Sequence, residues 1–312
     1  MKTFEIISDG SCDLSTEQVK ELDVKVVNFN ITFDAEHTYV ENENLTLDDF
    51  YNQILNNPNL YPTTSCPSPN SYYELFLNSY KNGLPVLCIC ISSKFSGSYS
   101  SAIIAKDQLL EEFPDAKVEI YDCRCNTVLQ GLYVKEAVRM RNDGKSFDEV
   151  VKDIKDVCGS RIFFTVSNLK YLEHGGRIGK LSALIGGILQ LNPIIILKHG
   201  EIFSGGVALK RKRALNNIID KLGAYFEKNK LSFSDYRFVV GYCVDKDEAL
   251  HLIDMLHKKY NINCDLERIG ATIAVHTGPG AIGIGFVRKF DHLLASENAG
   301  VVNLVTAKEN KN

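Results

Sequence analysis

VLCICISSKFSGSYSSAIIAKDQLL, residues 86–110, is the stretch that decides the fold of this chain. Residues 86–91 form a short continuous apolar run, which is typical of a strand buried on both faces of a parallel sheet. Residues 102–110 carry apolar side chains at close to helical spacing, so we expect a helix there. The turn between them, residues 92–99, holds four serines and one glycine. Free backbone N–H groups and hydroxyls at a helix N-terminus suit an anion and need no charged side chain.

A second hydroxyl-rich segment, YPTTSCPSP at residues 61–69, precedes another expected helix. Ser68 fits the N-cap position of that helix and Pro69 its first position. Helix capping alone would account for either segment, because Ser and Gly are common at helix starts. The occurrence of two such segments close together favours the hypothesis of an anion site.

Strand and helix patterns alternate through the first half of the chain. The expected strands cover 4–7, 24–33, 86–91 and 117–121, and the expected helices cover 16–22, 46–56, 70–81, 102–110, 127–142 and 146–157. This order predicts an α/β fold with a mainly parallel sheet. Ligands of such sheets bind outside the carboxyl ends of the strands, where both hydroxyl-rich turns would lie. Asp9 also follows a strand, and it either lines this crevice or belongs to an ordinary turn and cap.

The second half begins after Cys158-Gly159-Ser160, which predicts an N-terminal domain of residues 1–160 and a C-terminal domain of residues 161–312. Its expected strands cover 161–166, 192–197, 202–209, 236–243 and 262–268, and its expected helices cover 168–173, 214–228 and 246–259. The turn at 198–201 joins two of these strands into a hairpin. Hairpins mixed with helices predict an α+β domain.

The composition is that of an ordinary globular protein, with 45% of the 312 residues hydrophobic. The net charge of −4 argues against a nucleic-acid partner. No apolar run reaches the roughly 20 residues of a membrane-spanning helix. The N-terminus has no signal-peptide pattern, so we expect a cytoplasmic location and reduced cysteines. The pairs Cys88/Cys90 and Cys123/Cys125 have no matching ligand spacing, which favours core packing and no metal.

Two glycine-rich motifs do not fit nucleotide binding. In HGGRIGK, residues 174–180, only three residues separate Gly175 from Gly179 and a leucine follows the lysine. A P-loop needs four intervening residues and then Ser or Thr. GPGAIG, residues 278–283, satisfies G-x-G-x-x-G, but Pro279 lies in the turn and too little chain follows for a βαβ unit.

Several motifs, in order along nearly the whole chain, resemble those of the DegV family. They are SDGSCD at 8–13, TSCPS at 64–68, SSKFSGSY at 92–99, GGRI at 175–178, and His276 followed by GPG at 278–280. The resemblance implies a DegV-like fold with an N-terminal α/β domain and a C-terminal α+β domain. It also implies a protein that binds a long-chain fatty acid in an apolar tunnel between or beside its domains. Such a protein presents the carboxylate to a partner fatty acid kinase for acyl-phosphate formation, in phospholipid synthesis.

The resemblance carries specific expectations for the site. Thr64, Ser65 and Ser96 would meet the fatty-acid carboxylate, and Gly97 would add a backbone N–H. Arg177 and His276 would lie near the mouth, where the partner kinase transfers its phosphoryl group. No cofactor, metal or catalysis by this chain alone is implied. The implied partners are the fatty acid, the ATP-binding kinase and, transiently, a membrane.

Two features depart from the family pattern or leave alternatives open. Cys66 stands where Gln or another polar residue is expected, which puts local polar contacts in doubt. Apolar residues at helical spacing predict a helix over 181–189. These residues are Leu181, Leu184, Ile185, Ile188 and Leu189. The helix either packs in the core or forms one wall of an acyl-chain tunnel.

Two other functions are open at this point. A hydrolase could use Ser96 or Ser93 with His276, but neither serine lies in Gly-x-Ser-x-Gly and no orienting acid is identifiable. A structural or regulatory protein without a ligand is the third interpretation. A fatty acid found in protein extracted from cells would favour the lipid carrier over both.

Overall fold

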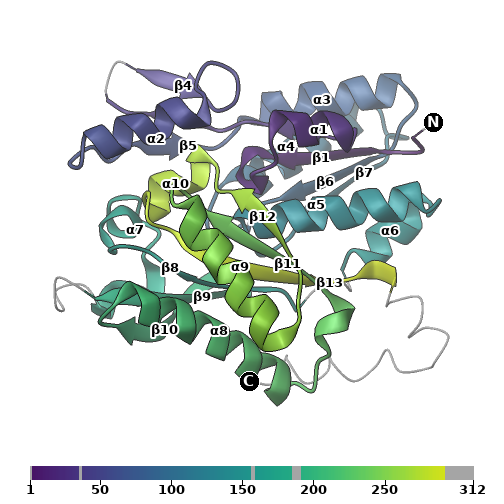
Figure 1. The fold of residues 1–312 in the computed structure, drawn as a ribbon. Helices are drawn as coiled ribbons and strands as arrows, with labels where there is room; N and C mark the ends of the chain where they lie inside the picture. Colours follow the sequence, from purple (N-terminus) through teal and green to yellow (C-terminus); the bar gives the residue numbers. More distant parts are fainter. Residues whose placement is uncertain (1, 35–36, 156–158, 185–190, 292–312) are drawn as a thin grey trace.

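The computed structural model describes residues 2–34, 37–155, 159–184 and 191–291. Four strands form a parallel sheet in the order β2-β1-β6-β7 (Figure 1). They are β1 (Glu5–Asp9), β2 (Lys25–Val27), β6 (Val86–Cys90) and β7 (Val118–Asp122). Every residue of β6 is buried, which explains its continuous apolar run. The predicted parallel sheet is therefore confirmed.

Helices cover both faces of this sheet. They are α1 (Thr16–Glu21), α3 (Pro69–Lys81), α4 (Ser98–Glu112), α5 (Thr127–Asn142) and α6 (Phe147–Asp153). α3 and α4 pack on one face, where Cys88 and Cys90 are core residues as predicted, and α5 packs on the other. The predicted cap of α3 is confirmed, because the Ser68 hydroxyl accepts a hydrogen bond of 3.2 Å from the backbone N–H of Ser71.

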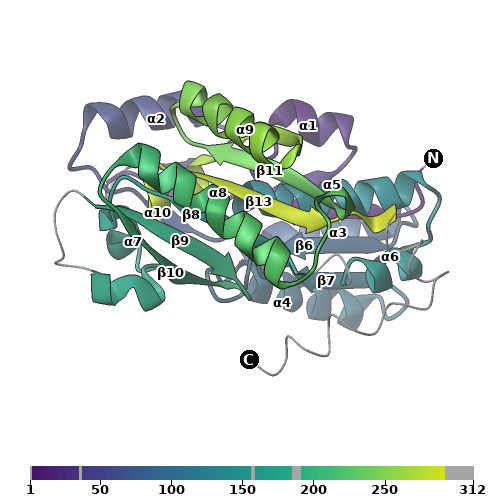
Figure 2. The ribbon, with the colours of Figure 1, turned by 60° about the horizontal axis from the view of Figure 1, so that its bottom comes forward.

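A second sheet of six strands has the order β10-β9-β8-β13-β11-β12. Its strands are β8 (Arg161–Thr165), β9 (Asn192–Lys198), β10 (Glu201–Ala208), β11 (Tyr236–Tyr242), β12 (Cys264–Arg268) and β13 (Ile282–Arg288). β11 and β12 run parallel, and the other neighbours run antiparallel. α8 (Arg211–Lys228) and α9 (Lys246–Tyr260) cover its outer face, and α5 lies between the two sheets (Figures 1 and 2). Gly241 permits this approach, since a Cβ there would lie 2.9 Å from Val128 Cγ2.

A small antiparallel sheet corrects two predictions. It has the order β4-β3-β5 and consists of β3 (Asn30–Thr32), β4 (Thr38–Val40) and β5 (Thr63–Ser65), beside α2 (Leu47–Asn56). Residues 24–33 form two strands, β2 and β3, in different sheets, and not one strand. Thr64 and Ser65 lie on β5 and not in a turn, because β3 supplies their pairing partners; Thr64 pairs with Ile31.

The remaining elements are short. They are α7 (Lys170–His174), α10 (Ala271–Thr277) and the 3₁₀ turns η1 (Gly10–Cys12), η2 (Gly179–Leu184) and η3 (Phe233–Asp235). The helix predicted over 181–189 begins as 3₁₀ in η2, and its later part lies outside the described residues. Cys158 of the predicted boundary also lies outside them, so the two-domain division stays a prediction. Among the helices that the structure describes, none has the length and apolar character needed to cross a bilayer.

Candidate functional site

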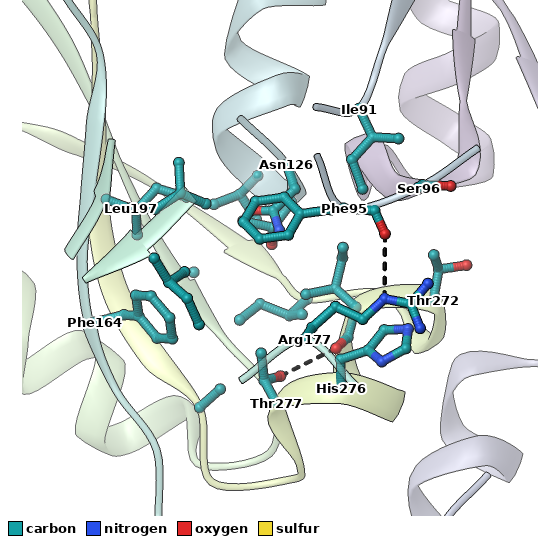
Figure 3. A pocket seen from close by; sticks show the side chains of 18 of the residues that line it. Ile91, Phe95, Ser96, Asn126, Phe164, Arg177, Leu197, Thr272, His276 and Thr277 are labelled. Carbon is teal, nitrogen blue, oxygen red and sulfur yellow. Dashed lines mark hydrogen bonds between the residues drawn. The ribbon is translucent and has the colours of Figure 1, made fainter. Parts of the chain in front are cut away.

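A cavity of about 320 Å³ lies between α5, the inner face of the six-stranded sheet and the β6–α4 turn (Figure 3). The residues expected to meet a ligand come from segments far apart in the chain. All of them line this cavity: Thr64, Ser65, Ser96, Gly97, Arg177 and His276. A cavity of this volume is in the range of small-molecule sites in proteins.

Most of the wall away from these residues is apolar. It includes Ile91, Phe95, Val128, Ile162, Phe164, Leu172, Leu197, Ile202, Ile269, Ile273 and Ile282. β8, β9, β10 and β13 supply much of this surface, so a ligand would lie along the six-stranded sheet. The cavity therefore combines one polar end with a long apolar wall.

The two hydroxyl-rich segments meet at the polar end. A Cβ on Gly97 would lie 3.3 Å from Sγ of Cys66, the residue after β5, which shows how closely this segment and the turn before α4 approach. The Ser96 hydroxyl accepts a hydrogen bond of 3.2 Å from the N–H of Ser98, which leaves its own proton free to be donated. The N–H of Gly97 donates no hydrogen bond within the described part of the chain. Ser65 is exposed, and alternation along β5 turns its side chain away from that of Thr64.

The buried carboxylate of Asp9 holds in place the turn between β6 and α4, which we call the serine turn. Asp9, at the end of β1, is fully buried. It accepts hydrogen bonds from the N–H of Ile91 at 2.9 Å and from the Ser98 hydroxyl at 2.7 Å. These two residues bracket the turn that carries Ser96 and Gly97. Of the two roles open for Asp9, the structure supports the structural one, because it pins the turn and does not line the cavity.

His276 forms a hydrogen bond with Thr64 at the polar end of the cavity. Its Nε2 lies 3.0 Å from Thr64 Oγ1. Burial, together with the nearby Arg177 cation, lowers the pKa of His276 to about 4, so the ring is neutral at pH 7. Its Nδ1 is buried against Gly175 and has no hydrogen-bond partner among the described residues. A buried N–H without a partner is rarer than an unused acceptor, which assigns the proton to Nε2. Nε2–H then donates to Thr64, which leaves the proton of the Thr64 hydroxyl free to be donated to a ligand.

The predicted position of His276 at the end of a strand is wrong, because the residue lies in α10. The N-terminus of that helix is capped by the buried Glu41 carboxylate, which accepts from the N–H groups of Ala271 at 2.5 Å and Thr272 at 3.2 Å. The Thr272 hydroxyl also donates to Glu41. A carboxylate at a helix N-terminus stabilises the helix. Glu41 comes from the loop after β4, and no local pattern in the sequence indicates this contact.

Arg177 connects the two halves of the chain at the cavity. Its Nε donates to the carbonyl of Phe95 in the serine turn at 3.2 Å (Figure 3). Its Nη1 donates to the carbonyl of Gly175 at 2.6 Å. The guanidinium is half-buried and lies beside the polar end. The cavity thus has a fixed cation close to its neutral donors.

Asp13 is a second acid beneath α10. Its Oδ2 accepts from the Thr127 hydroxyl at 2.5 Å, and its Oδ1 is buried beside the backbone of Gly270. A Cβ on Gly270 would lie 2.7 Å from Asp13 Oδ1 and 2.8 Å from Glu41 Oε1, so the two carboxylates are neighbours. Burial and the Glu41 charge raise the pKa of Asp13 well above 3.8, against the lowering effect of the Thr127 hydrogen bond.

Asp13→Asn is expected to stabilise the protein at neutral and alkaline pH. The folded state keeps a proton on Asp13 that the unfolded chain loses near pH 4, so wild-type stability falls as the pH rises above that value. The amide carries no such penalty. Urea unfolding at pH 4.5 and pH 8 measures this, with Asp107→Asn, an exposed aspartate on α4, as the control. A wild type and an Asp13→Asn variant with parallel pH dependence would refute the raised pKa.

A sequence model described as "Uncharacterised protein, DegV family" matches residues 3–289. The chain belongs to the DegV family. A DegV domain-containing protein of Clostridium perfringens is 32% identical over 92% of this chain and 98% of its own length. A further relative, from Clostridium acetobutylicum, is 31% identical and covers 90% of this chain and 96% of its own.

Solved structures of similar proteins share this fold. One, described as a fatty acid (stearic acid)-binding protein from Eubacterium ventriosum, has a TM-score of 0.88 and 38% identity, over 93% of this chain and 99% of its own. Another, described as DegV, a fatty acid binding protein from Bacillus subtilis, has a TM-score of 0.79 and 26% identity, over 93% and 100%. The predicted family and fold class are therefore confirmed.

Proposed function

We propose that this DegV family protein binds a long-chain fatty acid in the cavity and presents its carboxylate to a fatty acid kinase. The observation that carries the proposal is an apolar cavity whose polar end holds unused neutral donors. These are the Thr64 and Ser96 hydroxyls and the Gly97 N–H at the start of α4. The similar proteins described as binding fatty acids support the same ligand class.

Neutral donors suit a buried carboxylate. Hydrogen bonds to an ionised acceptor are about twice as strong as neutral ones. The N-terminus of the 15-residue helix α4 adds a favourable dipole. A cation buried directly against the carboxylate would carry its own desolvation cost, which these groups avoid. Arg177, half-buried and held by two carbonyls, adds positive charge nearby.

The acyl chain would lie against the apolar wall formed by β8, β9, β10 and β13. Each CH₂ group removed from water contributes roughly 0.8 kcal/mol, so chain burial supplies most of the affinity. The carboxylate contacts would then orient the ligand within the cavity. Presentation to an ATP-dependent kinase further implies a cytoplasmic protein.

The contacts of His276 do not favour a hydrolase. Its Nε2 bonds to Thr64, and no hydrogen bond joins it to Ser96 or Ser93 in the described part of the chain. A catalytic triad would need Nδ1 to bond to an acid, and this atom has no such partner in the residues that the structure describes. We therefore infer a carrier that makes no covalent bond itself and relies on the kinase for acyl-phosphate formation.

The test is the lipid content of the purified protein. Protein prepared without added lipid, denatured and extracted, should yield a long-chain fatty acid at close to one equivalent by mass spectrometry. Delipidated protein should regain one equivalent of stearic acid by calorimetry and should hydrolyse neither ATP nor an ester. If the purified protein contained no fatty acid and also failed to bind stearic acid, the carrier function would be excluded. Ester hydrolysis lost in both Ser96→Ala and His276→Ala would favour the hydrolase.

A further inference from the structure

One polar side chain lies in the cavity wall away from the carboxylate end. Asn126 precedes α5 and lines the cavity. In Figure 3 it lies between Leu197 on one side and Ser96 and His276 on the other. A carboxylate held at Thr64 and Ser96 would leave Asn126 beside the acyl chain. An amide is not needed there to bind an unsubstituted alkyl chain.

The other hydroxyl groups of this part of the wall already have partners. The Thr127 hydroxyl donates to Asp13, that of Thr272 to Glu41, and that of Thr277 to the carbonyl of Ile273 at 3.3 Å. The Asn126 side chain, in contrast, makes no hydrogen bond within the part of the chain that the structure describes. Its N–H₂ and its carbonyl oxygen are both available to a ligand.

The Asn126 side chain does not cap α5, although its position favours capping. Asn126 occupies the N-cap of α5, where Asn commonly accepts from the helix N–H groups, yet it makes no side-chain cap bond. The next residue, Thr127, has φ 56°, a left-handed conformation that is unusual for a β-branched residue. The hydrogen bond of 2.5 Å to Asp13 holds Thr127 there. Strained backbone of this kind is commonly found at ligand sites.

We propose that Asn126 recognises an oxygen on the acyl chain, so that the preferred ligand is a long-chain fatty acid with a hydroxyl group along its chain. The proposal rests on the proposed function, because it takes the carboxylate to lie at Thr64 and Ser96. A hydroxyl both donates and accepts, and so matches both halves of the amide. A keto oxygen only accepts and would use the N–H₂ alone.

The test compares stearic acid with hydroxystearic acids that differ in hydroxyl position, using delipidated protein and calorimetry. One positional isomer should bind the wild type roughly tenfold more tightly than stearic acid. Asn126→Leu, which keeps the size of the side chain and removes its polar atoms, should bind stearic acid more tightly and that isomer more weakly. A ratio of the two affinities that Asn126→Leu leaves unchanged would overturn the proposal, as would wild-type preference for stearic acid over every isomer.

Two further measurements separate the ways in which this test can fail. Wild-type protein that binds no fatty acid at all refutes the proposed function, not only the role of Asn126. Asn126→Asp covers the case of a Leu variant that does not fold. It keeps an acceptor and loses the donor, so it should retain the hydroxy acid and bind the matching keto acid at least several-fold more weakly than the wild type. Equal loss of both ligands in Asn126→Asp would contradict hydrogen bonding by the amide.

Discussion

The double variant Thr64→Val, Ser96→Ala is expected to lose at least about a hundredfold in affinity for stearic acid. Each substitution removes one hydroxyl donor from a desolvated carboxylate, and a hydrogen bond to a charged group contributes about 1.5–3 kcal/mol. Each single variant should therefore lose about tenfold or more. Neither residue belongs to the apolar core, so the cooperative thermal transition should persist. Calorimetric titration of delipidated protein measures the effect.

Matched controls lie next to both residues. Thr63→Val changes the neighbouring threonine on β5, whose side chain alternates to the exposed face. Ser100→Ala changes an exposed serine in the first turn of α4. Both controls should bind as the wild type does. If the double variant bound stearic acid with wild-type affinity, the carboxylate would not be bound at this end of the cavity. Equal losses for stearic acid and stearyl alcohol would show that the hydroxyls shape the cavity and do not bind the carboxylate.

The parts of the fold that could be predicted from the sequence are those with local causes. The continuous apolar run of β6 and the capping pattern at Ser68 and Pro69 depend on neighbours in the chain. The predicted helix over 127–142 has the observed bounds of α5. These segments needed no knowledge of distant contacts.

The elements that prediction missed depend on partners far along the chain. β5 is a strand because β3 pairs with it, and α10 is a helix whose N-terminus is capped by Glu41 from 231 residues before Thr272. β13 was not predicted because Gly283 and Gly285 resemble a turn. A Cβ on Gly285 would lie 3.3 Å from Leu129 Cβ, so α5 packs closely over this position. Single-sequence patterns contain no information on these contacts.

The site was predictable only through the family motifs. Thr64, Ser96, Gly97, Arg177 and His276 come from four segments, and composition or spacing alone would not bring them together. The motifs assigned them to one ligand, and the structure places them around one cavity. Their individual roles stay predictions. Glu41, which caps α10, and Asn126, which lines the cavity, were not predicted, because an isolated acid or amide has no distinctive pattern.

Arg177→Ala is expected to retain the fatty acid and to lose acyl-phosphate formation when kinase and ATP are added. The alkyl chain and the two hydroxyls supply most of the binding, so the affinity for stearic acid should fall less than about tenfold. In the proposed function the guanidinium would instead stabilise charge that develops as the phosphoryl group reaches the carboxylate, and loss of such a group costs roughly a hundredfold or more in rate. Lys180→Ala, at an exposed neighbouring cation, is the control. If delipidated Arg177→Ala could not be reloaded with stearic acid, we would conclude that Arg177 is needed to bind the fatty acid.

His276 variants separate orientation of the carboxylate from its binding. His276→Leu removes the donor to Thr64, so the Thr64 hydroxyl is no longer held toward the carboxylate, and acyl-phosphate formation should fall while most of the lipid is retained. A lost neutral hydrogen bond contributes only about 1 kcal/mol to binding. His276→Gln can place an N–H near the position of Nε2 and should restore the rate. Because the pKa of His276 is about 4, the imidazole is neutral throughout pH 6–8. The ratio of the wild-type rate to the His276→Gln rate should therefore not vary with pH in that range, and a change in this ratio near pH 6.5 would show instead that the ring acts as a proton carrier.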